Sequence, residues 1–337
     1  MNVLNKSIIE IAIASDSNYL VPTTVLMKSL FENNKESQFL INLIYLVSIT
    51  QEDDLCFWEE YAESHGHKLR KIPVVDEQLA VYPELRHSKS TYLRLLLPEL
   101  LPASVSKVVY LDADTIVVGD ISELYALDIS EFYAAAVKEV SRSYAKSIPF
   151  FQSHLELLKI APDRFYFGAG VMLMNLNKMR KDQVVEKYFQ FAIEYPEAII
   201  WSDQDVLNGV LNSSIKYVHP KFNMNYYVEP DILRATWGHK EVKEAKNNPV
   251  VIHYIGTIKP WHYISYHPRT SLWWKYLRMT PFEDFKPLNK STKLVLYKYY
   301  LRIMRMLDRN MTLSGKQKLG KLIPKGLKNK IKKGIGK

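Results

Sequence analysis

The chain has 337 residues but only one cysteine, Cys56, and it has no run of 18 apolar residues. A single cysteine excludes internal disulfides and cysteine-based zinc clusters, so we expect Cys56 to be a small core residue. The lack of a long apolar run argues against a membrane-spanning helix. Because residues 1–6 also lack the layout of a signal peptide, we expect a cytoplasmic protein.

Acidic residues are almost absent from the end of the chain. Residues 286–337 contain 16 Lys and Arg and one acid, Asp308, whereas residues 1–285 contain 29 basic and 35 acidic residues. We therefore expect a main domain of residues 1–285 and a basic tail of residues 286–337.

The tail has the pattern of an amphipathic helix. Basic and apolar residues recur on two different faces: Lys298, Arg302, Arg305 and Arg309 on one, and Leu294, Tyr297, Leu301 and Met304 on the other. Such a helix suits an anionic membrane surface, where each basic residue contributes about 1 kcal/mol. The alternatives are a solvated tail or a nucleic-acid-binding one. The acidic remainder of the chain and the lack of a finger or helix-turn-helix signature argue against nucleic acid.

The main domain alternates between strand and helix patterns, which predicts an α/β fold. Its first part reads β-α-β-α-β-α-β, typical of a mostly parallel sheet with flanking helices. We expect strands at residues 8–14, 39–45, 69–74, 108–111, 132–137 and 170–176. We expect helices at residues 22–31, 53–65, 91–97, 182–195 and 203–211, the second capped by Thr50 with Asp53.

One strand ends in two carboxylates. The apolar residues 107–111 are followed by Asp112 and Asp114. Residues two apart in an extended chain project to the same side, so both carboxylates can reach one divalent cation. Open α/β sheets bind ligands beyond the carboxyl ends of their strands. The alternative interpretation of Asp-Ala-Asp is a solvated turn.

Six segments, taken in order, make residues 8–280 resemble glycosyltransferase family 8. These are Ile-Ala-Ile-Ala-Ser-Asp-Ser-Asn-Tyr at 11–19, Thr-Tyr-Leu-Arg-Leu at 91–95, Tyr-Leu-Asp-Ala-Asp at 110–114, Phe-Gly-Ala-Gly-Val-Met-Leu-Met-Asn at 167–175, Ser-Asp-Gln-Asp-Val-Leu-Asn at 202–208, and His-Tyr-Ile-Gly-Thr-Ile-Lys-Pro-Trp at 253–261. The resemblance implies a retaining nucleotide-sugar transferase with a Rossmann-like GT-A fold. The pattern is most similar to the bacterial enzymes that add galactose or glucose to lipopolysaccharide cores.

The resemblance implies that Ala14, Asp16, Asn18 and Tyr19 hold the uracil and ribose of a UDP-sugar. A loop at a strand end can offer amides and a carboxylate to the base and ribose, and Tyr19 can stack on uracil. Turn chemistry is the alternative role for Asp16 and Asn18. Arg94 is a candidate donor-site cation, with a salt bridge at the surface or the rim of the core as its alternative.

The resemblance also implies that His253 completes a metal site with Asp112 and Asp114, and that Ala113 borders the donor. Two carboxylates and an imidazole favour Mn²⁺, with Mg²⁺ as a second possibility. A structural histidine is the alternative.

Further residues are implied for the diphosphate and the sugar. Gly256 permits close backbone approach to the diphosphate and Lys259 neutralises its charge. Asp203 and Gln204 match the family's sugar-contacting pair, with N-capping as the alternative role of Asp203. A carboxamide is a poor nucleophile, so we expect Gln204 to position the sugar, and the sequence leaves front-face attack and double displacement both open. Glu139 contacts donor or acceptor, or forms a surface salt bridge.

The chain departs from the family at Gly168, where an asparagine is usual, and this removes an amide expected at the donor sugar. The leading hypothesis is a Mn²⁺-dependent, retaining transferase of galactose or glucose from a UDP-sugar to lipopolysaccharide core or another lipid-linked glycan. It would bind the inner face of the cell membrane through its tail. The alternative, supported by Gly168, is a non-catalytic nucleotide-sugar or glycan-binding protein of the same fold.

Overall fold

The computed structural model describes residues 8–83, 89–140, 149–226, 236–265 and 267–290. The contacts divide the chain into two compact units, residues 1–254 with 275–283 and residues 255–274 with 284–337. The basic and apolar residues of the expected tail helix lie outside the described residues, so the boundary at residue 285 stays a prediction. None of the helices in the described ranges has the length and apolar character needed to cross a membrane.

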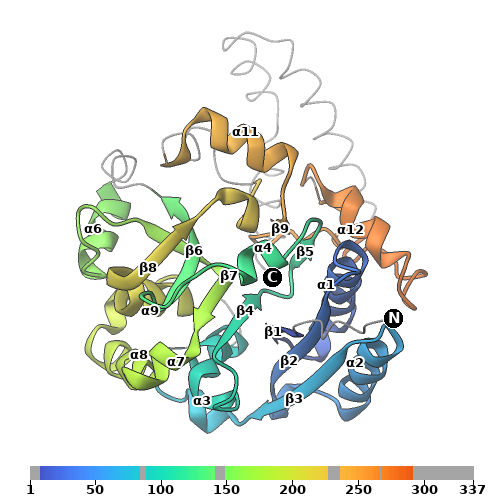
Figure 1. The fold of residues 1–337 in the computed structure, drawn as a ribbon, viewed down its shortest axis with the longest axis horizontal. Helices are drawn as coiled ribbons and strands as arrows, with labels where there is room; N and C mark the ends of the chain where they lie inside the picture. The colour runs from blue at the N-terminus through green and yellow to red at the C-terminus, as the bar shows by residue number, and fades with distance from the viewer. Residues whose placement is uncertain (1–7, 84–88, 141–148, 227–235, 266, 291–337) are drawn as a thin grey trace, which may run out of the picture. The chain divides into compact units, whose positions relative to one another are not determined.

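A mixed sheet forms the centre of the first unit (Figure 1). Its order is β3-β2-β1-β4-β7-β6-β8, and a separate ribbon pairs β5 with β9. The strands are β1 (Ile8–Ala14), β2 (Gln38–Leu46), β3 (Lys68–Val74), β4 (Lys107–Leu111), β5 (Thr115–Val117), β6 (Ala134–Val140), β7 (Tyr166–Asn175), β8 (Ile215–Val218) and β9 (Val251–His253).

The first four strands of this sheet are parallel, as the β-α alternation predicts. β7 then pairs antiparallel with both β4 and β6, and β6 pairs parallel with β8. The expected mixed, mostly parallel sheet is therefore confirmed.

Helices flank the sheet on both faces. They are α1 (Leu20–Asn33), α2 (Glu52–Ser64), α3 (Leu97–Leu100), α4 (Ser122–Tyr125), α6 (Pro149–Leu157), α7 (Leu176–Lys181), α8 (Val184–Glu194) and α9 (Asp203–Leu211). Two further helices are α11 (His239–Asn247), which packs on Met224, and α12 (Thr270–Leu277), most of which belongs to the second unit. Short 3-10 helices include η1 (Ser17–Tyr19), η4 (Lys89–Leu96) and η7 (Pro220–Asn223).

The strands build two cores because alternate residues point to opposite faces. On β4, Val109 and Leu111 join α1 and α2 in one core. Val108 and Tyr110 join η4, α8 and α9 in the other. A central strand buried on both faces is what the apolar run before Asp112 predicts.

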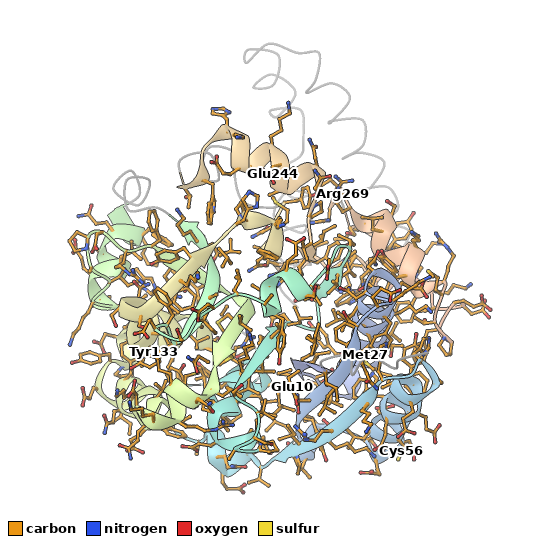
Figure 2. The ribbon with its side chains drawn as sticks, viewed as in Figure 1. Glu10, Met27, Cys56, Tyr133, Glu244 and Arg269 are labelled. Carbon is orange, nitrogen blue, oxygen red and sulfur yellow. The ribbon has the colours of Figure 1, made fainter. Side chains whose placement is uncertain are left out.

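The helix expected around residues 91–97 is present as the 3-10 helix η4, which continues into α3. Two other local expectations are wrong. The N-cap of α2 is Gln51 rather than Thr50, and its side chain makes no capping hydrogen bond. Cys56 lies on α2 at the edge of the sheet (Figure 2) and is half-buried, with Sγ 3.8 Å from Nζ of Lys71, so it is not a core residue.

The second unit contains a cluster of aromatic rings. The ring centroids of Trp261 and Trp273 are 5.4 Å apart, and those of Trp273 and Trp274 are 5.2 Å apart. The indole N–H of Trp274 donates to the carbonyl of Pro260 (3.0 Å). These contacts join Pro260 and Trp261, which directly follow Lys259, to Trp273 and Trp274 of α12.

Candidate active site

The two carboxylates after β4 and the histidine at the end of β9 are held together by backbone pairing. The backbone N–H of Asp112 donates to the carbonyl of Gly170 on β7 (2.8 Å), which anchors the turn to the central sheet. The N–H of Tyr254 donates to the carbonyl of Asp114 (3.0 Å). Since β5 follows Asp114 directly and pairs antiparallel with β9, residue His253 is brought to the same turn.

Asp112, Asp114 and His253 form a set of ligand atoms suited to one metal ion. Their ligand atoms lie within 4.8 Å of one another. Nε2 of His253 is 3.1 Å from Oδ1 of Asp114 and 3.6 Å from Oδ2 of Asp112. A Cβ added to Gly170 would lie 2.1 Å from Cε1 of His253 and 2.8 Å from Oδ2 of Asp112, so a glycine is required beside these two ligands. Two carboxylates and one imidazole fit a divalent cation of the Mn²⁺ type.

The two oxygens of Asp112 have different environments. Oδ1 accepts hydrogen bonds from the hydroxyl of Tyr110 (2.9 Å) and from Nη2 of Arg94 (2.7 Å). Oδ2 faces His253. These contacts fix the carboxylate by one oxygen and direct the other toward the position of a metal ion.

Arg94 is buried, and each of its three guanidinium nitrogens is used. Nη2 binds Asp112, Nε lies 2.9 Å from Oδ2 of Asp203, and Nη1 donates to the carbonyl of Ala169 (2.9 Å). Burial raises the pKa of Asp203 to about 7, and the guanidinium of Arg94 opposes that rise. Arg94 therefore joins the Asp112–Asp114 turn to the start of α9. The salt bridge that was the alternative role of Arg94 is present, buried toward Asp203 and partly exposed toward Asp112, and the role of Arg94 as a donor-site cation stays a prediction.

Gln204 follows Asp203 in the first turn of α9, and its amide is held from both sides. The backbone N–H of Ala169 donates to Oε1 (3.1 Å), and Nε2 donates to Oε2 of Glu139 (2.8 Å). Burial raises the pKa of Glu139. Asp203 is not the N-cap, since Ser202 occupies that position with a φ of 54°. A non-glycine residue in this conformation stores backbone strain next to the residues predicted to contact the sugar.

Similar proteins identify the chain. A model of glycosyl transferase family 8 matches residues 10–265. The chain belongs to this family. It is similar to the lipopolysaccharide 1,2-glucosyltransferase of Escherichia coli (strain K12), with 26% identity over 307 residues, covering 90% of this chain and 87% of that protein. It is also 26% identical to general stress protein A of Bacillus subtilis (strain 168) over 279 residues, which covers 81% of this chain and 94% of that protein.

A solved structure confirms the fold. The galactosyltransferase LgtC, in complex with donor and acceptor sugar analogues, matches with a TM-score of 0.69. The match covers 81% of this chain and 96% of that one at 23% sequence identity. The protein is thus a glycosyltransferase with the GT-A fold that the motifs predict.

The loop that the resemblance assigns to the nucleotide follows β1. Ala14 is the last residue of β1 and is half-buried. Asp16 is buried, and its Oδ1 accepts the backbone N–H of Asn18 (2.9 Å), which is the capping bond of η1. Asn18 is exposed. The turn role of Asp16 is therefore present in the structure, and the contacts of Ala14, Asp16 and Asn18 with a nucleotide stay predictions.

Tyr19, at the end of η1, lies within electrostatic range of the Asp112–Asp114 turn. Burial raises the pKa of Tyr19, and the charges of Asp114 and Asp112 raise it further. Its hydroxyl therefore stays protonated within electrostatic reach of both carboxylates. Ala113, between them, is buried. The donor roles of Tyr19 and Ala113 stay predictions.

The remaining predicted donor residues, Gly256 and Lys259, lie in the second unit. Gly168, the departure from the family pattern, is on β7, where an added Cβ would lie 3.1 Å from Nδ2 of Asn223 and 3.7 Å from Oε2 of Glu139. Gly256 has a φ of +85°, a conformation that favours glycine. The N–H of Lys259 donates to Nδ1 of His262 (3.2 Å). The diphosphate roles of Gly256 and Lys259 stay predictions.

A buried polar network around Asp205, next to Gln204, could not be predicted from the sequence motifs. Oδ1 of Asp205 lies 2.8 Å from Nε2 of His154 and accepts the hydroxyl of Tyr166 (2.8 Å). Oδ2 accepts the backbone N–H groups of Ile200 (2.8 Å) and Trp201 (2.6 Å). This network fixes the entry to α9 and so the position of the predicted sugar-contacting pair. A second acidic residue two positions after Asp203 was the available signal.

Proposed function

We propose that this protein is a metal-dependent, retaining transferase that moves galactose or glucose from a UDP-sugar to lipopolysaccharide core or another lipid-linked glycan. The observation that carries the proposal is the convergence of Asp112, Asp114 and His253. The named activity of the Escherichia coli relative, a lipopolysaccharide 1,2-glucosyltransferase, supports the choice of acceptor. The Salmonella typhimurium lipopolysaccharide 1,3-galactosyltransferase, 26% identical over 292 residues, supports the choice between two hexoses.

Asp112, Asp114 and His253 would hold Mn²⁺, with Mg²⁺ as the other candidate. A bound divalent cation would neutralise the donor diphosphate and stabilise UDP as it leaves. In the proposed donor site, Asp16 and Asn18 bind ribose and base, and Tyr19 stacks on uracil.

The sugar site is proposed at the start of α9. Arg94 holds Asp112 and Asp203 in one arrangement, so the metal site and the sugar site keep a fixed separation. Gln204 is held by Ala169 and Glu139, which suits an amide that orients the anomeric carbon rather than one that attacks it. In the net reaction, the bond from that carbon to the diphosphate is replaced by a bond to the acceptor oxygen, UDP leaves, and the proton of the acceptor hydroxyl passes to the departing phosphate in front-face attack or to a base in double displacement.

The test is UDP release by the purified full-length protein across a panel of UDP-sugars, with Mn²⁺ or EDTA, and with galactoside and glucoside acceptors. Release with one sugar that requires Mn²⁺ supports the proposal. Asp114→Ala, which leaves the ion pairs of Arg94 in place, is expected to abolish Mn²⁺-stimulated release. Asp128→Ala is the matched control, because Asp128 is an exposed carboxylate that accepts the N–H of Ser130. Tight UDP binding with no release from any sugar would favour a non-catalytic binding protein.

We also propose that the basic tail docks on an anionic membrane surface. Its 16 basic residues and one acid support this. Truncation before Lys290 is expected to abolish binding to vesicles that contain phosphatidylserine and to leave transfer to a soluble acceptor intact. Unchanged vesicle binding would contradict the docking proposal and would leave the transferase proposal untouched.

A further inference from the structure

His253 has a hydrogen-bond partner on its far side from the carboxylates. Its Nδ1 lies 3.0 Å from Oδ1 of Asn223, the last residue of η7. Its Nε2 points at Asp114 and Asp112. We propose that Asn223 is a positioning residue that holds the His253 imidazole with its proton on Nδ1 and its lone pair on Nε2, directed at the metal position. The proposal rests on the proposed metal-dependent function.

The tautomer follows from the chemistry of the two groups. An amide oxygen can only accept a hydrogen bond, so its partner Nδ1 must carry the proton. A neutral imidazole protonated on Nδ1 has its free lone pair on Nε2, which is the atom that a metal ion needs. If the amide were turned around, its NH₂ group would donate to Nδ1. The proton would then lie on Nε2, between the ring and the carboxylates, and would exclude the metal.

The amide of Asn223 has its oxygen toward His253. Oδ1 lies 3.0 Å from Nδ1 of the imidazole, whereas Nδ2 lies 3.1 Å from the position that a Cβ on Gly168 would take. The nitrogen end of the amide therefore lies beside β7, and the oxygen end is the one that meets the imidazole.

The backbone around Asn223 is fixed to the strand that carries His253. The N–H of Met224 donates to the carbonyl of Val251 (2.9 Å), and the N–H of His253 donates to the carbonyl of Met224 (3.1 Å). Before η7 ends, the N–H of Val250 also donates to the carbonyl of Lys221 (2.8 Å). These bonds hold the amide and the imidazole at one separation, so the orientation is built into the fold before any metal binds.

Two glycines on β7 give these side chains their space. Gly168 and Gly170 are two residues apart and therefore project to the same face of the strand. An added Cβ at the first would crowd the Asn223 amide, and one at the second would overlap the His253 ring. The departure from the family's usual asparagine at position 168 thus borders the residue that orients the metal-binding histidine.

The experiment measures the Mn²⁺ dissociation constant of the full-length protein without nucleotide, from the electron paramagnetic resonance signal of free Mn²⁺. Asn223→Ala is expected to weaken binding by about 10- to 100-fold, the usual effect of removing a hydrogen-bond partner of a metal-binding histidine. Asn223→Asp keeps an acceptor oxygen and is expected to restore wild-type affinity or exceed it. Asn175→Ala is the matched control, because Asn175 also makes side-chain hydrogen bonds but lies at the end of β7 far from Gly168 and Gly170. This variant should bind Mn²⁺ with wild-type affinity.

His253→Ala separates the possible failures. Wild-type affinity in Asn223→Ala, alongside weak binding by His253→Ala, overturns the inference alone. Wild-type affinity in His253→Ala overturns the metal site and the inference together. If Asn223→Ala does not fold, Asn223→Asp decides, since a tenfold loss in that variant contradicts an acceptor role. Wild-type protein that binds Mn²⁺ but releases no UDP refutes the proposed function and leaves the role of Asn223 standing.

Discussion

Gly170→Ala is the smallest change that the structure predicts to destroy the metal site. Gly170 lies in the middle of β7 with a negative φ, so alanine meets no backbone strain there and the effect is steric. The added Cβ would lie 2.1 Å from Cε1 of His253, whereas ordinary contacts begin near 3.4 Å. The imidazole must therefore retreat by the difference, about 1.3 Å. Metal–ligand distances tolerate shifts of only about 0.2 Å.

Mn²⁺ affinity of Gly170→Ala is therefore expected to fall by more than about 100-fold, beyond the loss typical of removing an outer hydrogen-bond partner. The overpacked strand should also lose about 1–3 kcal/mol of unfolding free energy. Mn²⁺ titration and urea unfolding measure the two effects separately. Gly168→Ala is a milder comparison, because its Cβ would lie 3.1 Å from Nδ2 of Asn223, which is a smaller overlap, and it should reduce Mn²⁺ affinity less.

A folded Gly170→Ala protein with wild-type Mn²⁺ affinity would refute this reasoning. It would mean either that His253 is not a ligand or that the ring has room that the structure does not show. Crystallisation of the variant with Mn²⁺ would separate these two explanations.

Three further changes test other parts of the structure. Arg94→Lys keeps the charge but not the three-way guanidinium contact, so it should lower the unfolding free energy by about 1–3 kcal/mol in urea titrations. Burial lowers the pKa of His67 to about 4, so the unfolded state binds more protons between pH 4 and 6.5 and stability should fall as the pH drops through this range. His67→Gln should flatten that part of a plot of melting temperature against pH. Gly209→Ala on α9 places a Cβ 2.4 Å from the ring of Phe191 and should lower the melting temperature despite the better helix propensity of alanine.

The parallel half of the sheet could be predicted because its strand directions follow from the alternation of strands and helices along the chain. Each strand there is followed by a helix before the next strand, and this alternation implies parallel neighbours. The place of β7 between β4 and β6 could not be predicted in the same way. Its antiparallel pairing with both joins segments that are more than 20 residues apart in the chain, and nothing in their periodicity sets that order.

Capping was predicted less well than the elements themselves. Thr50 and Asp203 have the side chains of good caps, yet neither is an N-cap in the structure. The carboxylate of Asp203 instead forms an ion pair with Arg94, which is more than 100 residues away in the chain. A long-range ion pair in the interior competes with a local hydrogen bond, and local sequence shows only the second.

The residues of the candidate site also fall into those that local sequence reveals and those that only long-range contacts reveal. Asp112 and Asp114 could be found because their spacing and their place at a strand end are both visible in the sequence. Asn223 could not, because it comes 30 residues before His253 and meets it only through the pairing of η7 with β9. Tyr110 was similarly hidden, since on a central strand it reads as a core residue while its hydroxyl binds Asp112.

The charges at the site explain why a cation is expected there. Asp112, Asp114, Asp203 and Glu139 can carry four negative charges, and Arg94 supplies one positive charge. The raised pKa values of Asp203 and Glu139 show that burial disfavours their charged forms. A diphosphate would bring further negative charge to this place, which like-charge repulsion would oppose. In the proposed function, a divalent cation at the three ligand atoms would remove that obstacle, so the acidic cluster that would repel a nucleotide-sugar by itself would, with the cation, bind it.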